Sequence, residues 1–349
     1  MPGPDLPPSP TALTGADVDR VADRRRRDEA WLAVQLASPS ARAIVLGDAG
    51  VRADGGRVAR IPLGDLDELI GDAAPPLGSG SAAAFGASDA AGISAAPLVF
   101  LGLDAEGPLF AVDEAPPAPG ERARLVGAGG MRGEAPPEAD GRIGLRVAAQ
   151  TLSQADGGLV AYAAGLLNWH RTHRFCGTCG GPTTPREGGM VRRCAVCGSS
   201  LHPRTDPVVI MLVTDGAERV LLGRQAVWPA RRYSTLAGFV SHGESLEEAV
   251  AREVMEEVGV QVGQAVYAAS QPWPFPHSLM LGFHVPWTGG EIGAGDEELE
   301  HAAWFSRAEV LEAVQEDGWD APGDGTGLLL PPRLAIARIL VESWVRETA

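Results

Sequence analysis

Three glutamates that lie close together in the sequence could hold a divalent cation. Glu253, Glu256 and Glu257 are spaced i, i+3 and i+4, and a helix that turns by about 100° per residue brings such positions onto one face. Three carboxylates on one face repel one another, but a bound cation reverses the sign of that interaction. Hard oxygen ligands suit Mg²⁺ or Mn²⁺, which a few carboxylates hold together with phosphate oxygens of a substrate. Taken alone, such a cluster is more often an ordinary solvated acidic face.

A helix around these glutamates is predicted by its own end signals. Ser245 is followed three residues later by Glu248, the pattern of a capping box, which predicts a helix start at about residue 245. Gly259 is a suitable helix stop. Arg252, inside this helix, is expected to orient a glutamate through a bidentate pair rather than to contact substrate.

The cysteines form a second candidate metal site. All four lie in two Cys-x-x-Cys pairs that are separated by fourteen residues: Cys176, Cys179, Cys194 and Cys197. This is the pattern of a tetrahedral zinc ribbon, which is structural because no coordination position stays open. Two disulfides or a redox pair are the alternatives, and an intracellular thiol environment disfavours the disulfides. Three nearby histidines are expected to be packing or surface residues: His170, His173 and His202.

Residues 270–278 read SQPWPFPHS and form a candidate binding segment. Prolines lower the entropy lost on ordering a loop, so the segment can present rings and polar groups in a fixed pose. A flat heteroaromatic ligand such as nicotinamide or adenine would suit it. The alternative is a proline-rich structural turn around a buried Trp273.

These motifs together resemble one known family. Residues 238–260, GFVSHGESLEEAVAREVMEEVGV, match every fixed position of the signature of the Nudix hydrolase family. The SQPWPFPHS segment is similar to the element that separates NADH pyrophosphatases from other members. That family also carries a four-cysteine ribbon just before its Nudix domain, and the lead-in LLNWHRTHRFCGTCG resembles it. Members of the wider family hydrolyse nucleoside diphosphates linked to another moiety.

The resemblance implies roles for individual residues. Glu253 and Glu257 would be direct Mg²⁺ or Mn²⁺ ligands, and Glu256 a ligand or a water-orienting partner; all three are candidate catalytic residues. The carbonyl of Ala237 and the carboxylate of Glu298 would complete the metal site, with Glu297 as a near-equal rival for the latter. Candidate substrate-binding residues are Phe239, which would stack on a base, Gln271, Pro272, Trp273, Pro274, Phe275, Pro276, His277, Ser278, Ala337, His202 and Arg146.

Two positions depart from the family pattern. Ser241 stands where the family commonly has glutamate, outside the fixed signature, so metal binding should survive. His202 stands where the family often has tyrosine before a Pro-Arg-x-Asp-Pro run, which affects the expected affinity more than the reaction type.

Composition limits the partners. The 349 residues include 29 basic and 45 acidic side chains, giving a formal net charge of −16. Such a charge argues against general nucleic-acid binding and against an anionic membrane surface, although the capped 5′ end of an RNA stays a candidate. No apolar run approaches the ~20 residues of a membrane span, and the N-terminus lacks the pattern of a signal peptide. We therefore expect a cytoplasmic protein, and the resemblance implies a homodimer.

The sequence predicts an α/β fold in four parts. These are a disordered N-terminus (1–14), an N-terminal α/β domain (15–168), the zinc ribbon (169–203) and a Nudix domain with an α/β/α sandwich (204–349). In the first domain we expect strands at 41–47, 97–103 and 108–112, a mobile loop at 75–97, and a helix at 158–171. In the last we expect strands at 208–213, 219–223, 265–270 and 278–285, and a helix at 332–346.

The resemblance implies metal-dependent hydrolysis of NADH or NAD⁺ to AMP and nicotinamide mononucleotide, with the same reaction on NAD-capped RNA as a further role. The alternative hypothesis is a non-catalytic regulator, in which the ribbon recognises nucleic acid and the Nudix domain senses a dinucleotide. That alternative is disfavoured because every carboxylate of the signature is present.

Overall fold

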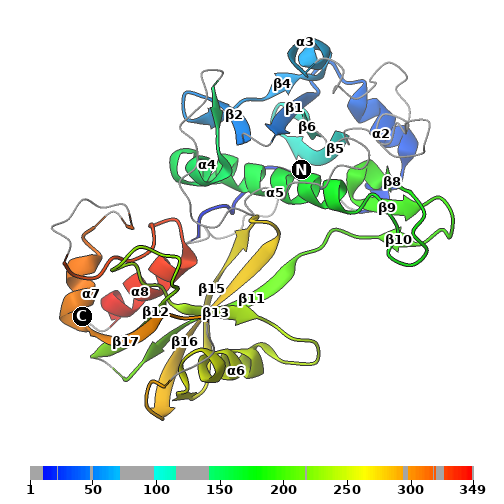
Figure 1. Cartoon of the computed structure of the whole chain (residues 1–349). Coiled ribbons are helices and arrows are strands. Elements are labelled where there is room, and N and C mark those ends of the chain that lie inside the picture. Colours follow the sequence, from blue (N-terminus) through cyan, green and yellow to red (C-terminus); the bar gives the residue numbers. More distant parts are fainter. Residues whose placement is uncertain are drawn as a thin grey trace. The chain divides into compact units, whose positions relative to one another are not determined.

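The computed structural model describes residues 11–21, 23–47, 50–70, 98–114, 141–216, 218–293, 298–316, 318–319 and 326–347 (Figure 1). The chain divides into two compact units. The first contains Leu13–Arg204 and Pro274–His277, and the second contains Thr205–Trp273 and Ser278–Ala349. None of the helices in the described ranges is long and apolar enough to cross a membrane.

The first unit is built on a sheet with strand order β3-β2-β1-β6-β5, in which β4 pairs with β1 and β7 with β2. The strands are β1 (Arg42–Gly47), β2 (Gly50–Asp54), β3 (Arg57–Val58), β4 (Ile61–Pro62), β5 (Leu98–Asp104), β6 (Gly107–Asp113) and β7 (Arg142–Ile143). Strands β1 and β6 are parallel, and the other pairs are antiparallel.

Helices cover both faces of this sheet, so its central strands are apolar at successive positions. The helices are α1 (Asp23–Arg26), α2 (Glu29–Leu36), α3 (Leu66–Ile70), α4 (Leu145–Thr151) and α5 (Gln154–Thr172). Ile44 of β1 packs in one core cluster with α4 and α5, whereas its neighbour Val45 packs in another with α2. Alternate side chains of a strand point to opposite faces, which explains the unbroken apolar run of β1.

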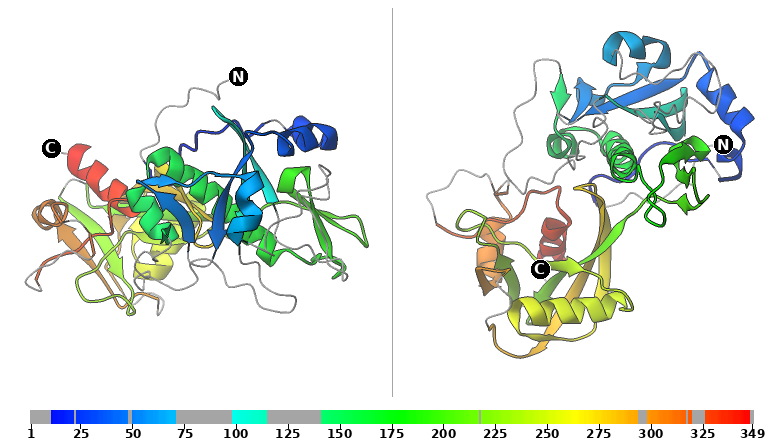
Figure 2. Two further views of the ribbon diagram at one scale, coloured as in Figure 1. Left: turned by 90° about the horizontal axis from the view of Figure 1, so that it is seen from above. Right: turned by 45° about the vertical axis from the view of Figure 1, so that its right-hand side comes forward.

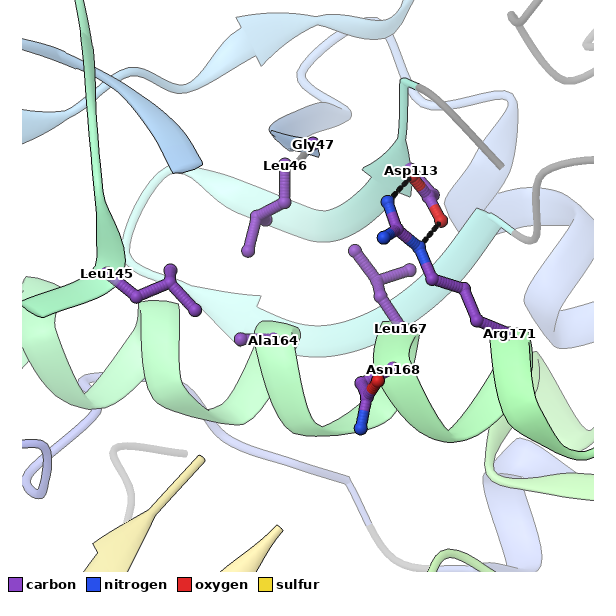
Figure 3. Close-up of a pocket in the computed structure, with 8 residues that line it drawn as sticks. All are labelled: Leu46, Gly47, Asp113, Leu145, Ala164, Leu167, Asn168 and Arg171. Carbon is purple, nitrogen blue, oxygen red and sulfur yellow. Dashed lines mark hydrogen bonds and ion pairs between the residues drawn. The ribbon is translucent and has the colours of Figure 1, made fainter. Parts of the chain in front are cut away.

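A buried ion pair fastens α5 to β6. Arg171 donates from Nε and Nη2 to the two carboxylate oxygens of Asp113, at 2.5 and 2.6 Å (Figure 3). The pair lies at one end of a narrow pocket with room for about one water molecule. Asn168 lines the same pocket and its buried amide has no hydrogen-bond partner among the described residues. The apolar remainder of the lining is Leu46, Leu145, Ala164 and Leu167.

A three-stranded sheet with order β10-β9-β8 forms the cysteine-bearing ribbon, which belongs to the first unit. Its strands are β8 (Thr183–Arg186), β9 (Val191–Cys194) and β10 (Ser200–Leu201). Arg192 of β9 is buried. It donates to the carbonyl and hydroxyl of Thr183 and to Nδ1 of His170 on α5, each at 2.8 Å. The second ring nitrogen of His170 donates to the Gly189 carbonyl at 2.8 Å, so this histidine joins α5 to the ribbon.

The second unit is a mixed sheet with order β14-β16-β11-β12-β17, to which β13 adds on β11 and β15 on β16. The strands are β11 (Asp206–Thr214), β12 (Arg219–Arg224), β13 (Leu236–Phe239), β14 (Gln261–Val262), β15 (Val266–Trp273), β16 (Ser278–Gly289) and β17 (His301–Ser306). Helix α6 (Leu246–Val258) packs on one face, and α7 (Arg307–Ala313) and α8 (Ile336–Glu347) pack on the other (Figure 2). The predicted α/β/α sandwich is confirmed.

Several expectations need correction or lie outside the described residues. The predicted mobile loop at 75–97 lies outside them, as do residues 1–10. The expected disorder does not extend to 11–14, because Thr11 and Leu13 are buried and the Thr11 hydroxyl donates to the Ser270 carbonyl at 2.8 Å. Helix α5 begins earlier than predicted, at Gln154, since Ser153 accepts a hydrogen bond from the Asp156 N–H as its N-cap. Division of the chain into the four predicted parts stays a prediction.

Candidate metal and substrate site

Helix α6 carries the signature glutamates, and its ends are set by the predicted residues. The Ser245 hydroxyl accepts from the Glu248 N–H at 3.2 Å, and the Glu248 carboxylate accepts from the Ser245 N–H at 2.7 Å. Gly259 ends the helix with φ at 73°, a left-handed conformation that favours glycine. The predicted capping box and helix stop are both confirmed.

Strand β13 lies directly against the glutamate face of α6. A Cβ atom placed on Gly238 would lie 1.9 Å from the Glu253 carboxyl carbon, so only glycine lets the strand and this carboxylate approach so closely. Ala237 precedes Gly238 and pairs with Ile210 of β11. The Glu253 carboxylate lies against Gly238, so the backbone of the preceding residue, Ala237, is adjacent in sequence to that point of contact.

Arg252 is the centre of the charge network on α6. Its Nε and Nη2 donate to the two oxygens of Glu244 at 2.5 and 2.9 Å, the bidentate geometry expected of an orienting arginine. Its Nη1 donates to both Glu253 and Glu256 at 2.8 Å, and Nη2 also donates to the Phe239 carbonyl at 2.9 Å. Arg252 holds the pKa of Glu244 at about 2, below its ordinary value of 4.5. The sequence indicated that Arg252 pairs with a glutamate, but not that Glu244 is the main partner.

The remaining carboxylates are buried or lie near other negative charges. Glu257 is only 5% exposed, an uncommon position for a carboxylate unless a cation or donors compensate its charge. Burial raises the pKa of Glu253, and the charges of Glu256 and Glu298 raise it further, against the lowering effect of Arg252. The structure therefore brings Glu298 close enough to Glu253 to affect it. Glu297 lies outside the described residues.

A divalent cation fits this donor set, because it would neutralise a buried carboxylate and its acidic neighbours. The glutamate oxygens are more widely spread than the thiol groups of the ribbon. Among the described residues, the four cysteines form the only group of three or more His, Cys, Asp or Glu ligand atoms within 4.8 Å of one another. In the glutamate site, Arg252 bridges Glu253 and Glu256 instead.

The four cysteine sulfurs have the spacing of a zinc site. The Cys176–Cys197 Sγ distance is 3.7 Å and the Cys179–Cys194 distance is 3.5 Å. A tetrahedron with Zn–S bonds of about 2.3 Å has edges of roughly 3.8 Å. Backbone N–H groups of Thr178 and Val196 point at Cys176 and Cys194 from 3.4 Å, and such donors stabilise thiolates. No disulfide joins any of the cysteines.

The structure divides the proline-rich segment between two environments. Gln271 is fully buried, donates to the carbonyls of Ala12 (3.2 Å) and Leu334 (2.7 Å), and accepts from the Ile336 N–H at 2.9 Å. Its amide therefore fastens the start of α8, and the predicted contact of Gln271 with substrate stays a prediction. Trp273 and Ser278 are half-buried and face each other as the last antiparallel pair of β15 and β16.

The other half of the segment, Pro274–His277, belongs to the first unit. Phe275 packs against the core cluster that contains α5, and the Arg146 guanidinium lies 4.5 Å from its ring centroid, in cation–π geometry. Pro274 is buried, and Pro276 and His277 are half-buried. His202 is exposed at the end of the ribbon. Arg146 and Phe275 are thus brought together, as a pair that contacts each other.

Of two further predicted contacts, Phe239 is exposed and Ala337 is buried. The Phe239 side chain is 60% exposed beside the Glu253 cluster, so its ring can stack on a base. Ala337 lies in the first turn of α8, is only 4% exposed and packs in the core beneath this helix. The predicted roles of these residues as substrate contacts stay predictions.

Comparison with known proteins agrees with this geometry. Residues 204–323 match the NUDIX domain family, residues 171–201 the NADH pyrophosphatase zinc ribbon domain, and residues 56–169 the NADH pyrophosphatase-like rudimentary NUDIX domain.

Two relatives illustrate the likeness. The NAD-capped RNA hydrolase NudC of Mycobacterium bovis is 45% identical over 203 residues, which are 58% of this chain and 64% of that protein. The mitochondrial NAD(P)H pyrophosphatase of Mus musculus is 47% identical over 208 residues, 58% of this chain and 59% of that protein. The chain thus matches less than two thirds of the length of these relatives. From the three successive domain matches and the glutamate site on α6, the chain belongs to the Nudix superfamily and has the ribbon-containing arrangement of its NADH pyrophosphatase family.

Proposed function

We propose that this protein hydrolyses the pyrophosphate bond of NADH or NAD⁺, releasing AMP and nicotinamide mononucleotide, with Mg²⁺ or Mn²⁺ as the required ion. One observation carries the proposal: helix α6 presents Glu253, which the charge of Glu298 affects, together with the buried Glu257, and Arg252 orients this acidic face. The printed names of the two relatives, an NAD-capped RNA hydrolase and an NAD(P)H pyrophosphatase, support the substrate.

The residues of the site divide the work of a hydrolysis. Glu253, Glu257, Glu298 and the Ala237 carbonyl would hold the cations. When bound, these ions would neutralise charge on the diphosphate and lower the pKa of a coordinated water. Glu256 projects half-exposed from the same face and would accept a proton or orient the water. Arg252 fixes Glu253 and Glu256 through hydrogen bonds from one nitrogen, so neither carboxylate must be ordered when substrate arrives.

Substrate contacts would come from rings and backbone groups near the site. The exposed Phe239 ring would stack on a base, and we propose a backbone contact from Ala337, in the first turn of α8, on family resemblance. Ser278 and Trp273 would contact the ligand from the end of β15 and β16. We propose further contacts from Arg146, Phe275 and His202 on family resemblance alone.

The same hydrolysis on the 5′ end of an NAD-capped RNA is a second candidate function. It is favoured by the printed name of the Mycobacterium bovis relative. The chemistry is identical, because the cap contains the same pyrophosphate bond. The two substrates differ only at the adenosine ribose, to which the rest of the RNA chain is attached in the capped RNA.

A panel of substrates tests the proposal. Purified protein would be incubated with NADH, NAD⁺, ADP-ribose or an NAD-capped oligonucleotide, with Mg²⁺ or Mn²⁺. AMP release would be measured for the small molecules, and release of nicotinamide mononucleotide, which leaves a 5′-monophosphate end, for the oligonucleotide. We expect NADH or NAD⁺ to be cleaved and chelation by EDTA to stop the reaction. High activity on ADP-ribose together with no cleavage of NADH would overturn the proposed specificity, but the assignment of hydrolase activity would stand. A protein that binds dinucleotides and cleaves none would favour the regulator hypothesis.

Location and assembly are proposed on the family resemblance. We expect a cytoplasmic protein and a homodimer, which light scattering coupled to size-exclusion chromatography would distinguish from a monomer.

A further inference from the structure

The ribbon has the opposite charge balance to the rest of the chain. Residues 169–203 contain five arginines and one glutamate, within a protein whose formal net charge is −16. One of the five, Arg171, lies on α5 and pairs with Asp113. The other four are Arg174, Arg186, Arg192 and Arg193. The one acid, Glu187, lies 3.4 Å from the exposed Arg27 and is offset by it. The net charge of the whole chain, from which we excluded general nucleic-acid binding, therefore hides a basic module.

The strand register shows that several exposed polar and basic residues share one face of the ribbon sheet. Thr184, Arg193 and Ser200 lie directly opposite one another across β8, β9 and β10, and cross-strand partners project from the same face. Arg186 follows Thr184 by two residues and projects to the same face. Arg186, Arg193 and Ser200 are exposed.

An aromatic side chain continues this face. Phe175 pairs with Pro182 in an antiparallel bridge, and Pro182 precedes Thr184 by two residues on the same face. The Phe175 ring is 54% exposed, which is costly for an aromatic side chain that nothing covers. Within the described ranges, no carboxylate lies within ion-pair distance of Arg186 or Arg193. Cys194, which lies opposite Thr183 at the alternate register position, projects from the other face of the sheet.

We propose that this open face, defined by Phe175, Thr184, Arg186, Arg193 and Ser200, binds single-stranded RNA. A ring flanked by cations is the combination that single strands use: bases stack on the ring and phosphates pair with the arginines. A duplex hides its bases from such a ring, so single strands bind more tightly than double strands. The choice of RNA rests on the proposed function, which would bring a capped RNA to this protein.

Binding of an uncapped strand tests the surface without any hydrolysis. The full-length zinc-loaded protein, without Mg²⁺ or Mn²⁺, would be titrated into a fluorescein-labelled single-stranded oligoribonucleotide of about ten nucleotides, with anisotropy as the readout. We expect Phe175→Ala to weaken binding about tenfold, the loss of one stacked base. The double variant Arg186→Gln/Arg193→Gln should reduce the slope of log K against log salt by about 1.4, or about 0.7 for each lost phosphate contact.

Matched controls separate this surface from bulk charge and from misfolding. Arg346→Gln removes an exposed arginine from α8 in the second unit and should change neither quantity. Zinc content and the unfolding temperature should stay at wild-type values in every variant, because the altered side chains are exposed.

Three outcomes would overturn the proposal. These are wild-type affinity in both ribbon variants, equal affinity for duplex and single strand, or equal displacement of the RNA by an acidic peptide such as polyglutamate. Failure here would leave NADH hydrolysis by the wild-type protein untouched. Conversely, RNA binding through this face in a protein that cleaves no dinucleotide would refute the proposed function alone.

Discussion

At the scale of single residues, Glu257 is the most informative position, because burial of a carboxylate costs free energy that a bound cation would help to offset. Glu257→Gln keeps the shape and removes the charge. We expect kcat to fall by roughly a thousandfold or more, while the unfolding temperature of the metal-free protein stays the same or rises. Steady-state AMP release and calorimetry measure the two effects. A large loss of stability without metal would mean that Glu257 is a structural residue.

Arg252 offers a second test, because its planar fork cannot be replaced by an ammonium group. One guanidinium donates to Glu244, Glu253, Glu256 and the Phe239 carbonyl. Arg252→Lys keeps the charge but should lower kcat/KM by about ten- to hundredfold through misplaced carboxylates. Isothermal titration with Mn²⁺ would show weaker metal binding. If the lysine variant retains full activity, charge alone suffices and orientation by the fork is unnecessary.

Glu244 gives a pH-dependent prediction. Its pKa of about 2 in the folded protein lies below the ordinary value of 4.5. A depressed carboxyl pKa contributes stability above the unfolded value and loses that contribution as the pH falls towards the folded value. The difference in unfolding temperature between wild type and Glu244→Gln should therefore be constant near neutral pH and shrink between pH 4.5 and about 2. A difference that stayed constant down to pH 2 would contradict this prediction.

At the scale of elements, local signals were the ones that sequence reasoning could read. The capping box and the terminal glycine set the ends of α6 within a few residues of sequence, so both ends were predictable. The start of α5 was missed because Gly157 and Gly158 weaken a helical pattern. The structure gives the reason for one of them: a Cβ on Gly158 would lie 2.6 Å from the Thr14 carbonyl oxygen. The two residues of that contact are far apart in the sequence, so no local sequence pattern reveals it.

Gln271 shows the same limit at the site. Its residue type and motif suggested a substrate contact, but its partners, Ala12, Leu334 and Ile336, are remote in sequence. We expect Gln271→Ala to lower the free energy of unfolding by about 2–4 kcal/mol, because buried donors and acceptors lose their partners. KM for NADH in the remaining folded protein should change by less than about twofold. Denaturant titration measures the free energy of unfolding, and steady-state kinetics measures KM. A raised KM with unchanged stability would support the substrate role instead.

At the scale of the whole molecule, the ribbon is joined to the rest of its unit by buried polar contacts. Arg192 of β9 donates to His170 of α5, and burial holds the pKa of His170 near 3, so its ring stays neutral and accepts that hydrogen bond. This link predicts how far the effect of zinc spreads. The metal stabilises the turns formed by the two Cys-x-x-Cys pairs, these turns hold β9, and β9 places Arg192 against α5.

Removal of zinc should therefore loosen more than the ribbon. Since folding free energy is coupled to metal binding, chelation should speed amide hydrogen exchange in β8 and β9 and also at the end of α5 around His170. Strand β16 of the second unit should keep its protection and serves as the internal reference. His170→Gln with zinc bound should speed exchange at the end of α5 alone, which separates the link from the metal. Hydrogen exchange with mass spectrometry resolves these segments. If chelation loosened β8 and β9 while α5 kept full protection, the Arg192–His170 contact would not transmit stability, and the ribbon would be an independent module.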